Sequence, residues 1–172
     1  MPRNFKTQLA GQIGESLVVA ELGRRGVVAS AFAGNVPDID ILAYRDGFTT
    51  ALQVKSIRTG SVSFDASRYL LIDFEGDKQI VKGCDPSIDH SLIYVFVSIG
   101  LQAGNDSIFI LHKGQLQKII YENHVGWLIK HGGVRPKNPK SMHVSVSISD
   151  LQDFKDNWAV IDSRLSANSP HG

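Results

Sequence analysis

The chain has 172 residues, of which 42% are hydrophobic, and its formal net charge is +1 at pH 7. This length and composition favour one globular domain with a substantial core, and the near-neutral charge excludes the strong basicity that would by itself mark a nucleic-acid-binding protein. We expect the domain to span residues 1–162 and residues 163–172 to form a disordered tail.

Three sequence features bear on where the protein works. The single cysteine, Cys84, excludes an internal disulfide and fits a reducing compartment. The first residues, MPRNFKTQLAGQ, have no apolar signal core, and the longest apolar run, LIYVFVSIGL, is about half as long as a membrane helix. We therefore expect a soluble, cytoplasmic protein without a membrane partner.

The N-terminal part of the chain predicts a helix followed by a β-hairpin. Apolar residues recur at helical spacing between residues 7 and 25, and Gly26 supplies a stop signal. Two runs with strand-like alternation follow at 39–44 and 49–57. They are joined through Asp46-Gly47, and this dipeptide between alternating runs is a strong hairpin signal.

The rest of the chain alternates between strands and helices. A polar loop, KHGGVRPKNPKS, separates a long helix from a late strand, and residues 149–152, SDLQ, have the form of a capping box that opens a last short helix toward Trp158. This order predicts an α/β fold with a mixed sheet flanked by helices. The further expected elements are strands at 69–74, 92–99, 107–111 and 143–148 and a helix at 113–130.

The hairpin turn predicts which side chains face one another. If Asp46 and Gly47 are the two central turn residues, Asp40 lies opposite Gln53. Asp38 then lies opposite Lys55, and the period of two along a strand places all four side chains on one face. The predicted cluster contains two acids, an amide and an ammonium group.

The first helix adds a further carboxylate to this picture. Glu15 lies among small and apolar residues on the helical wheel, which indicates an inward position. A carboxylate in such a position needs a polar or charged partner. Gly11 and Gly14 on the same helix would let it approach the sheet closely and bring Glu15 toward the polar end of the hairpin.

These features together resemble the PD-(D/E)xK nuclease superfamily. The resemblance covers roughly residues 8–58 and rests on the helix sequence GQIGESLVVAELGRRG, the stretch PDIDI at 37–41 and the tripeptide QVK at 53–55. Within the superfamily, the layout is most similar to restriction-endonuclease-like and Holliday-junction-resolvase-like members. It implies a restriction-endonuclease-like mixed sheet flanked by helices, DNA as the partner and a homodimer.

The resemblance also implies a role for each residue. Asp40 matches the metal-binding aspartate, or Asp38 does if the Pro-Asp dipeptide is the anchor. Gln53 stands at the (D/E) position, Lys55 at the lysine and Glu15 at the glutamate that part of the superfamily carries on its first helix. The implied metal ligands are Asp40, Gln53 and Glu15, and the implied cofactor is Mg²⁺ or Mn²⁺.

Gln53 departs from the usual motif and keeps two functions open. An amide oxygen can ligate a hard cation, but one negative charge is lost. The first hypothesis is a metal-dependent endonuclease that hydrolyses DNA, and the second is a catalytically silent nuclease-like domain that binds nucleic acid or a protein. On a purely structural interpretation, the aspartates cap a strand, Lys55 protects a sheet edge and Glu15 is solvated.

A second basic region lies in the loop before the late strand. Arg135, Lys137 and Lys140 follow one another along a short path whose freedom is limited by prolines. They are candidates for contacts to phosphate groups, and the alternative is an ordinary solvated loop.

Overall fold

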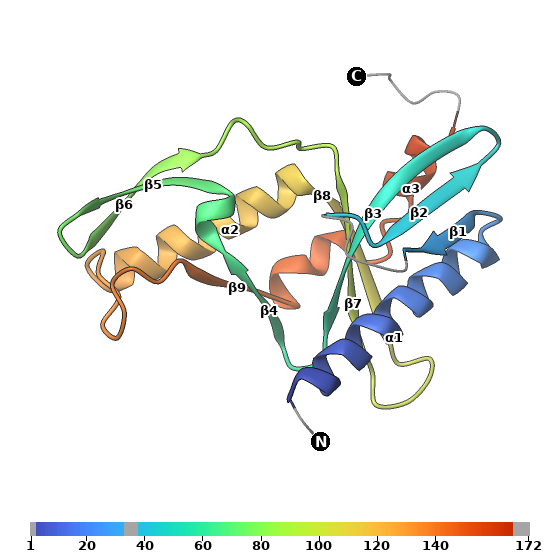
Figure 1. The fold of residues 1–172 in the computed structure, drawn as a ribbon, viewed down its shortest axis with the longest axis horizontal. Coiled ribbons are helices and arrows are strands. Elements are labelled where there is room, and N and C mark those ends of the chain that lie inside the picture. The colour runs from blue at the N-terminus through green and yellow to red at the C-terminus, as the bar shows by residue number, and fades with distance from the viewer. Residues whose placement is uncertain (1–2, 33–37, 167–172) are drawn as a thin grey trace.

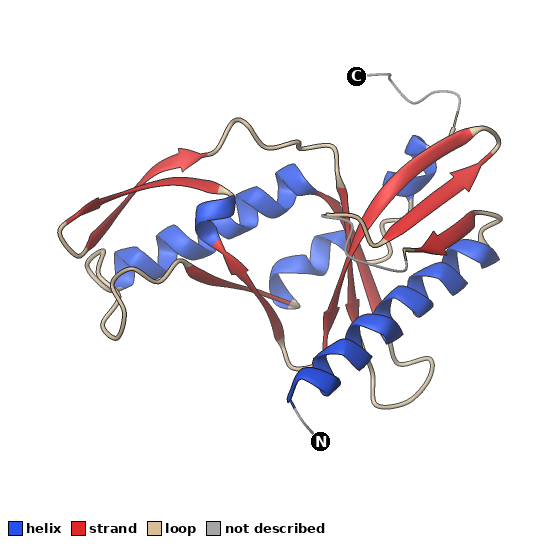
Figure 2. Ribbon diagram, in the orientation of Figure 1, coloured by secondary structure: helices blue, strands red, loops and turns tan. Residues whose placement is uncertain are grey.

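The structure is a computed structural model that describes residues 3–32 and 38–166, with side chains from Phe5 onward (Figures 1 and 2). Its helices are α1 (Arg3–Arg24), α2 (Lys113–Lys130) and α3 (Ala159–Arg164), with the 3₁₀ helices η1 (Ala66–Arg68) and η2 (Ser149–Phe154). Its strands are β1 (Val28–Ala31), β2 (Ile41–Arg45), β3 (Phe48–Ile57), β4 (Ser61–Asp65), β5 (Leu70–Glu75), β6 (Lys78–Cys84), β7 (Ile93–Ser98), β8 (Ser107–His112) and β9 (His143–Ser147).

A five-stranded mixed sheet with the order β1-β2-β3-β7-β8 forms the centre of the fold. Its neighbouring strands are antiparallel except β3 and β7, which run parallel. Five of the six residues of β7 are buried, as expected for a strand covered on both faces. The predicted fold class, an α/β arrangement with a mixed sheet flanked by helices, is confirmed.

The two faces of the sheet belong to different hydrophobic clusters. On one face, α1 and α3 pack against side chains such as Leu52, Val54 and Val95. On the other face, α2, η2, β4 and β9 pack against side chains such as Tyr94 and Phe96. The alternation along β3 and β7 therefore places Gln53 and Lys55 on the face opposite to α1, because each pairs with a residue of the second set.

A second layer extends away from the sheet on the side of α2. β4 pairs with β9, and β5 with β6, in two separate antiparallel ladders. Figure 1 shows the β5–β6 hairpin lying along α2, at the end of the molecule opposite to α1. The chain between β3 and β7 supplies β4, β5 and β6 to this layer, and the chain after β8 supplies α2 and β9.

Several predicted elements need correction. The expected capping box at 149–152 is absent, because Ile148 is the N-cap of η2 and makes no side-chain capping bond. The Gln152 side chain instead donates to the Ile148 carbonyl. Residues 163 and 164 belong to α3 and Leu165 is 1% exposed, so the expected tail begins too early, while 167–172 lie outside the described residues. Within the described ranges, no helix is long and apolar enough to cross a membrane.

Candidate active site

The hairpin of β2 and β3 has the predicted register. Asp46 and Gly47 adopt φ values of 52° and 89°, which is the left-handed backbone that a two-residue hairpin turn requires. Pairing begins at Arg45 and Phe48 and continues to Ile41 and Leu52. The backbone N–H of Asp40 then donates to the Leu52 carbonyl at 2.9 Å, which extends the ladder by one residue.

Asp40 and Gln53 meet directly at the end of this ladder. The Gln53 side-chain Nε2 donates a hydrogen bond to Asp40 Oδ2, and the backbone N–H of Val54 donates to the same oxygen at 2.7 Å. Gln53 is only 6% exposed. Asp40 Oδ1 has no hydrogen bond to any residue that the structure describes. The Asp40 carboxylate is therefore oriented through one oxygen and keeps the other available to a ligand.

Asp38 does not continue the strand. Its φ of 62° turns the backbone away from β3, so the predicted pairing opposite Lys55 is wrong. The Asp38 carboxylate lies 3.8 Å from the Arg68 guanidinium on η1, and about half of its side chain is exposed. Pro37, the other half of the predicted anchor, lies outside the described residues.

Lys55 lies two residues beyond Gln53 on the same face of β3. It lines a pocket of about 260 Å³, which Asp38 also lines. The expected proximity of these two residues is therefore present, although a turn and not a strand pair produces it. Arg68 and Lys113 line the same pocket and bring two further cations.

Glu15 on α1 lies within electrostatic range of this cluster. Burial raises the pKa of the Glu15 carboxyl, the Asp40 carboxylate raises it further, and Lys55 lowers it. No hydrogen bond or ion pair joins Glu15 to another residue among those described. The structure therefore brings Glu15, Asp40 and Lys55 into one neighbourhood, as expected, without direct contact.

The close approach of α1 to β3 depends on Gly14. A Cβ atom at this position would collide with Ser56 Oγ on β3. Gly11 has a different environment, since a Cβ there would meet only Glu15 Oε1, at 4.0 Å. Of the two glycines that predicted a close approach, Gly14 has this role and Gly11 does not.

The donor set decides which metal could be held here. Within the described ranges, no three His, Cys, Asp or Glu side chains form a cluster that could hold an ion. Asp40 and Glu15 supply two carboxylates, and Mg²⁺ commonly uses one or two protein carboxylates and completes its shell with water and phosphate oxygens. Water and substrate oxygens would therefore have to complete the shell of an Mg²⁺ or Mn²⁺ ion held by these two carboxylates.

The pocket contains residues that the sequence pattern did not reveal. Arg68 follows β4 on η1, and Lys113 is the first residue of α2. Tyr69 and Tyr94 also line the pocket, and their hydroxyls lie 3.2 Å apart. No local motif marks these residues, because they come from elements far apart in the sequence and meet only in the folded chain.

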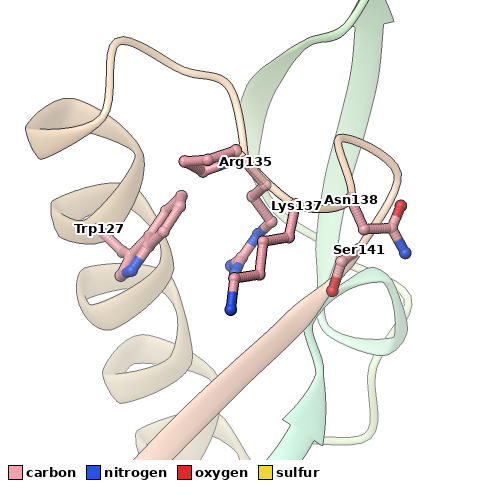
Figure 3. A pocket seen from close by; sticks show the side chains of 6 residues that line it. Trp127, Arg135, Lys137, Asn138 and Ser141 are labelled. Atoms are coloured by element: carbon pink, nitrogen blue, oxygen red, sulfur yellow. The ribbon is translucent and has the colours of Figure 1, made fainter.

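The basic loop after α2 lines a separate pocket of about 320 Å³ (Figure 3). Figure 3 shows Trp127 on α2 facing the Arg135 side chain, whose guanidinium carbon lies 4.3 Å from the centre of the indole ring. Lys137 lines this pocket and is exposed, whereas Lys140 lies over the Phe74 ring with its ammonium nitrogen 4.4 Å from the centre.

Arg135 is committed to contacts within the protein. It donates to the His143 carbonyl at 2.6 Å and to His124 Nδ1 at 3.3 Å. His124 is fully buried, and burial together with Arg135 lowers its pKa to about 4. Since Arg135 can only donate, Nδ1 of the neutral imidazole accepts and Nε2–H donates to Gln79. Of the three predicted phosphate-binding cations, Arg135 thus also holds the loop in place.

Comparisons with known proteins found one distant structural match and no sequence match. No protein-family model matches the chain, and no curated protein sequence matches it. A solved structure of a bacterial homing endonuclease, I-Ssp6803I, is similar to it with a TM-score of 0.48 and 12% sequence identity, covering 90% of this chain and 92% of that one. A likeness of this degree assigns neither a family nor a function to this chain.

Proposed function

We propose that the protein is a divalent-metal-dependent endonuclease that hydrolyses DNA phosphodiester bonds. One observation carries the proposal: Asp40 and Gln53 meet at the end of the hairpin, and Lys55 follows on the same face beside a pocket rich in cations. A carboxylate with one free oxygen next to an ammonium group suits a reaction in which a metal-bound phosphate gains negative charge.

The metal ligands in this proposal are Asp40 and Glu15, with Gln53 beside them. When bound, Mg²⁺ or Mn²⁺ supplies a more acidic water and neutralises charge on the phosphate. The motif gives Gln53 a ligand role through its amide oxygen. Its Nε2 also holds Asp40 Oδ2, which leaves Asp40 Oδ1 oriented for coordination. Ionised Glu15 is disfavoured by burial and by Asp40, and a nearby divalent cation would favour its charged form.

Lys55 acts on the phosphate in this proposal. Its side chain enters the pocket from β3, and it is only half-buried, so a substrate can reach it. The ammonium group would orient the attacking water or offset the charge that develops on the phosphate oxygens. Interactions that strengthen as this charge develops accelerate the chemical step more than they strengthen binding.

The Asp40–Gln53 contact favours a second candidate function, a silent nuclease-like domain that binds nucleic acid or a protein. An amide donor satisfies Asp40 Oδ2 without a metal, whereas two facing carboxylates would need a cation or a shared proton. In a silent domain, the same pair would be a structural hydrogen bond that closes the end of the hairpin.

A cleavage assay on the purified wild type distinguishes the two candidates. The substrates are supercoiled, linear, branched and single-stranded DNA, each incubated with Mg²⁺, Mn²⁺, Ca²⁺ or a chelator. The proposal expects cleavage of at least one substrate with Mg²⁺ or Mn²⁺ and none with the chelator. Binding without cleavage under every condition would identify a silent domain. The homodimer that the resemblance implies is part of the proposal, and sedimentation in the presence of DNA tests it.

A further inference from the structure

The pocket beside Lys55 contains more cationic groups than the nuclease motif requires. Lys55, Arg68 and Lys113 come from β3, η1 and α2, and they face two carboxylates, Asp38 and Asp65. Asp65 is occupied locally, because its Oδ1 accepts from both the backbone N–H and the hydroxyl of the residue two positions later. The groups left to receive a ligand are therefore mainly cationic.

Two buried tyrosines add a hydrogen-bond donor to the pocket. Tyr69 is 6% exposed and Tyr94 is 3% exposed, and their hydroxyls form one hydrogen bond with each other at 3.2 Å. Two hydroxyls carry two hydrogens, and this bond uses one of them. No other side chain or carbonyl among the described residues bonds to either hydroxyl. One buried O–H therefore lacks an acceptor at the wall of the pocket, and a ligand oxygen would satisfy it.

Arg68 is the exposed cation of this pocket, whereas Lys55 and Lys113 are partly buried. Its guanidinium lies 3.8 Å from the Asp38 carboxylate, and its side chain is 71% exposed. An ion pair of this length and exposure contributes little stability, so a more highly charged anion can replace Asp38. The planar guanidinium can bind two oxygens of a phosphate group at once.

Lys113 adds a cation at the start of a long helix. It is the first residue of α2, and the backbone N–H groups of Lys113 and Gly114 already donate to carbonyls, so α2 contributes the Lys113 ammonium group to the pocket. The helix start alone would not make a site. Here it coincides with an unsatisfied tyrosine hydroxyl and with two other cations on separate elements.

We propose that this pocket binds a phosphate group of the substrate, with Arg68, Lys113 and the Tyr69–Tyr94 hydroxyl pair as ligands in addition to Lys55. That the phosphate belongs to a nucleic acid rests on the proposed function. The phosphate group can be an internal phosphodiester of the strand or a terminal phosphate, since both present the same oxygens to the pocket. Arg68, Lys113 and the tyrosines would thus position the strand beside Lys55.

The test measures binding in a chelating buffer, where no metal-dependent cleavage occurs. Fluorescence anisotropy compares a duplex without terminal phosphates, the same duplex with 5′-phosphates, and competition by inorganic phosphate. The variants are Arg68→Ala and the double variant Tyr69→Phe/Tyr94→Phe. The double variant is needed because either single change leaves one free hydroxyl hydrogen, and removing both partners of a hydrogen bond is nearly neutral for stability.

Arg24→Ala is the matched control, since Arg24 is also an exposed arginine, at 77%, that pairs with one carboxylate. Arg68→Ala should weaken duplex binding about five-fold or more and reduce the salt slope by about 0.9. The Tyr69→Phe/Tyr94→Phe variant should weaken binding about three-fold or more, because one hydrogen bond to the phosphate is lost. Arg24→Ala should leave affinity unchanged, and thermal unfolding confirms that each variant folds.

The outcomes test the phosphate site independently of the proposed endonuclease activity. Losses on both duplexes support an internal phosphodiester as the ligand, and losses only on the phosphorylated duplex support a terminal phosphate. Equal DNA affinities of the wild type, Arg68→Ala and the double variant would reject phosphate binding in this pocket, even if the wild type cleaves DNA. Arg68-dependent binding in a protein that never cleaves would support the pocket and reject the endonuclease.

Discussion

Gln53 donates a side-chain hydrogen bond to Oδ2 of Asp40, so the residue that departs from the nuclease motif directly contacts the proposed metal ligand. A glutamate at position 53 could not donate this bond, and its charge would face that of Asp40. Glutamine therefore orders the end of the hairpin without a cation, whereas the usual carboxylate would require a cation or a shared proton. The exchange of Gln53 for Glu tests this difference.

Gln53→Glu should raise divalent-cation affinity and lower stability in a chelating buffer. The added carboxylate gives the ion a further hard ligand, while the lost hydrogen bond and the new repulsion should cost about 1–3 kcal/mol of unfolding free energy. Calorimetry with Mn²⁺ and urea unfolding with and without Mn²⁺ measure the two effects. A variant that binds Mn²⁺ no more tightly than wild type would argue against a metal at this position.

Glu15→Gln should stabilise the metal-free protein at neutral pH. The pKa of Glu15 is raised in the folded chain, so its contribution to stability is present below its ordinary value and is lost as the pH rises through the raised one. The amide removes this loss. Thermal unfolding from pH 4 to 8 in a chelating buffer should show a smaller decline for the variant.

The same Glu15→Gln variant should bind Mn²⁺ more weakly than wild type, because a carboxylate ligand has been replaced. Glu122→Gln on α2 is the control, since Glu122 is an exposed carboxylate that does not line the pocket beside Lys55. Unaltered Mn²⁺ affinity in Glu15→Gln would exclude Glu15 as a ligand.

Gly14→Ala should destabilise the fold by about 1–3 kcal/mol, because its Cβ would collide with Ser56 Oγ where α1 crosses β3. Gly23→Ala in the same helix meets no atom within 4 Å and should stabilise by about 0.5–1 kcal/mol. Ser56 Oγ is buried without a hydrogen-bond partner among the described residues, so Ser56→Ala should rescue Gly14→Ala. Denaturant unfolding measures the stabilities of the wild type, Gly14→Ala, Gly23→Ala and the double variant Gly14→Ala/Ser56→Ala. Equal stabilities of Gly14→Ala and Gly23→Ala would contradict this account of the helix contact.

The basic loop should separate into a structural and a nucleic-acid-binding part. Arg135→Ala should destabilise the protein by about 1–3 kcal/mol, because it leaves the His143 carbonyl and His124 Nδ1 unpaired. Lys137→Ala should leave stability unchanged and reduce the salt slope of DNA binding by about 0.9. An unchanged slope in Lys137→Ala would place Lys137 outside the interface.

The hairpin could be predicted from sequence because the residues that determine it lie close together along the chain. Asp46-Gly47 fixes the turn, the turn fixes the register, and the register places Asp40 beside Gln53. The helix at 113–130 was predicted with the bounds that the structure has, because Leu116, Ile120 and Leu128 recur at helical spacing. Its buried positions also include the polar residues Gln117 and His124, which an apolar pattern does not reveal.

The elements that sequence analysis missed depend on distant partners. β4 pairs with β9, whose first residue is His143, so this short strand has no partner nearby in the sequence. β1 is a four-residue edge strand whose stability comes from β2. Sequence analysis missed Arg68 and Lys113 for the same reason, because only the folded second layer brings them close to Lys55.

Single-turnover rates test most directly whether Asp40 and Lys55 carry out metal-dependent DNA cleavage. With saturating protein and Mg²⁺ or Mn²⁺, Asp40→Asn and Lys55→Ala should each cleave at least about 100-fold more slowly than wild type, while Lys55→Ala keeps its DNA affinity within a few-fold. Arg24→Ala should cleave at the wild-type rate. Wild-type rates for both Asp40→Asn and Lys55→Ala, from preparations free of other nucleases, would contradict the assignment of the site.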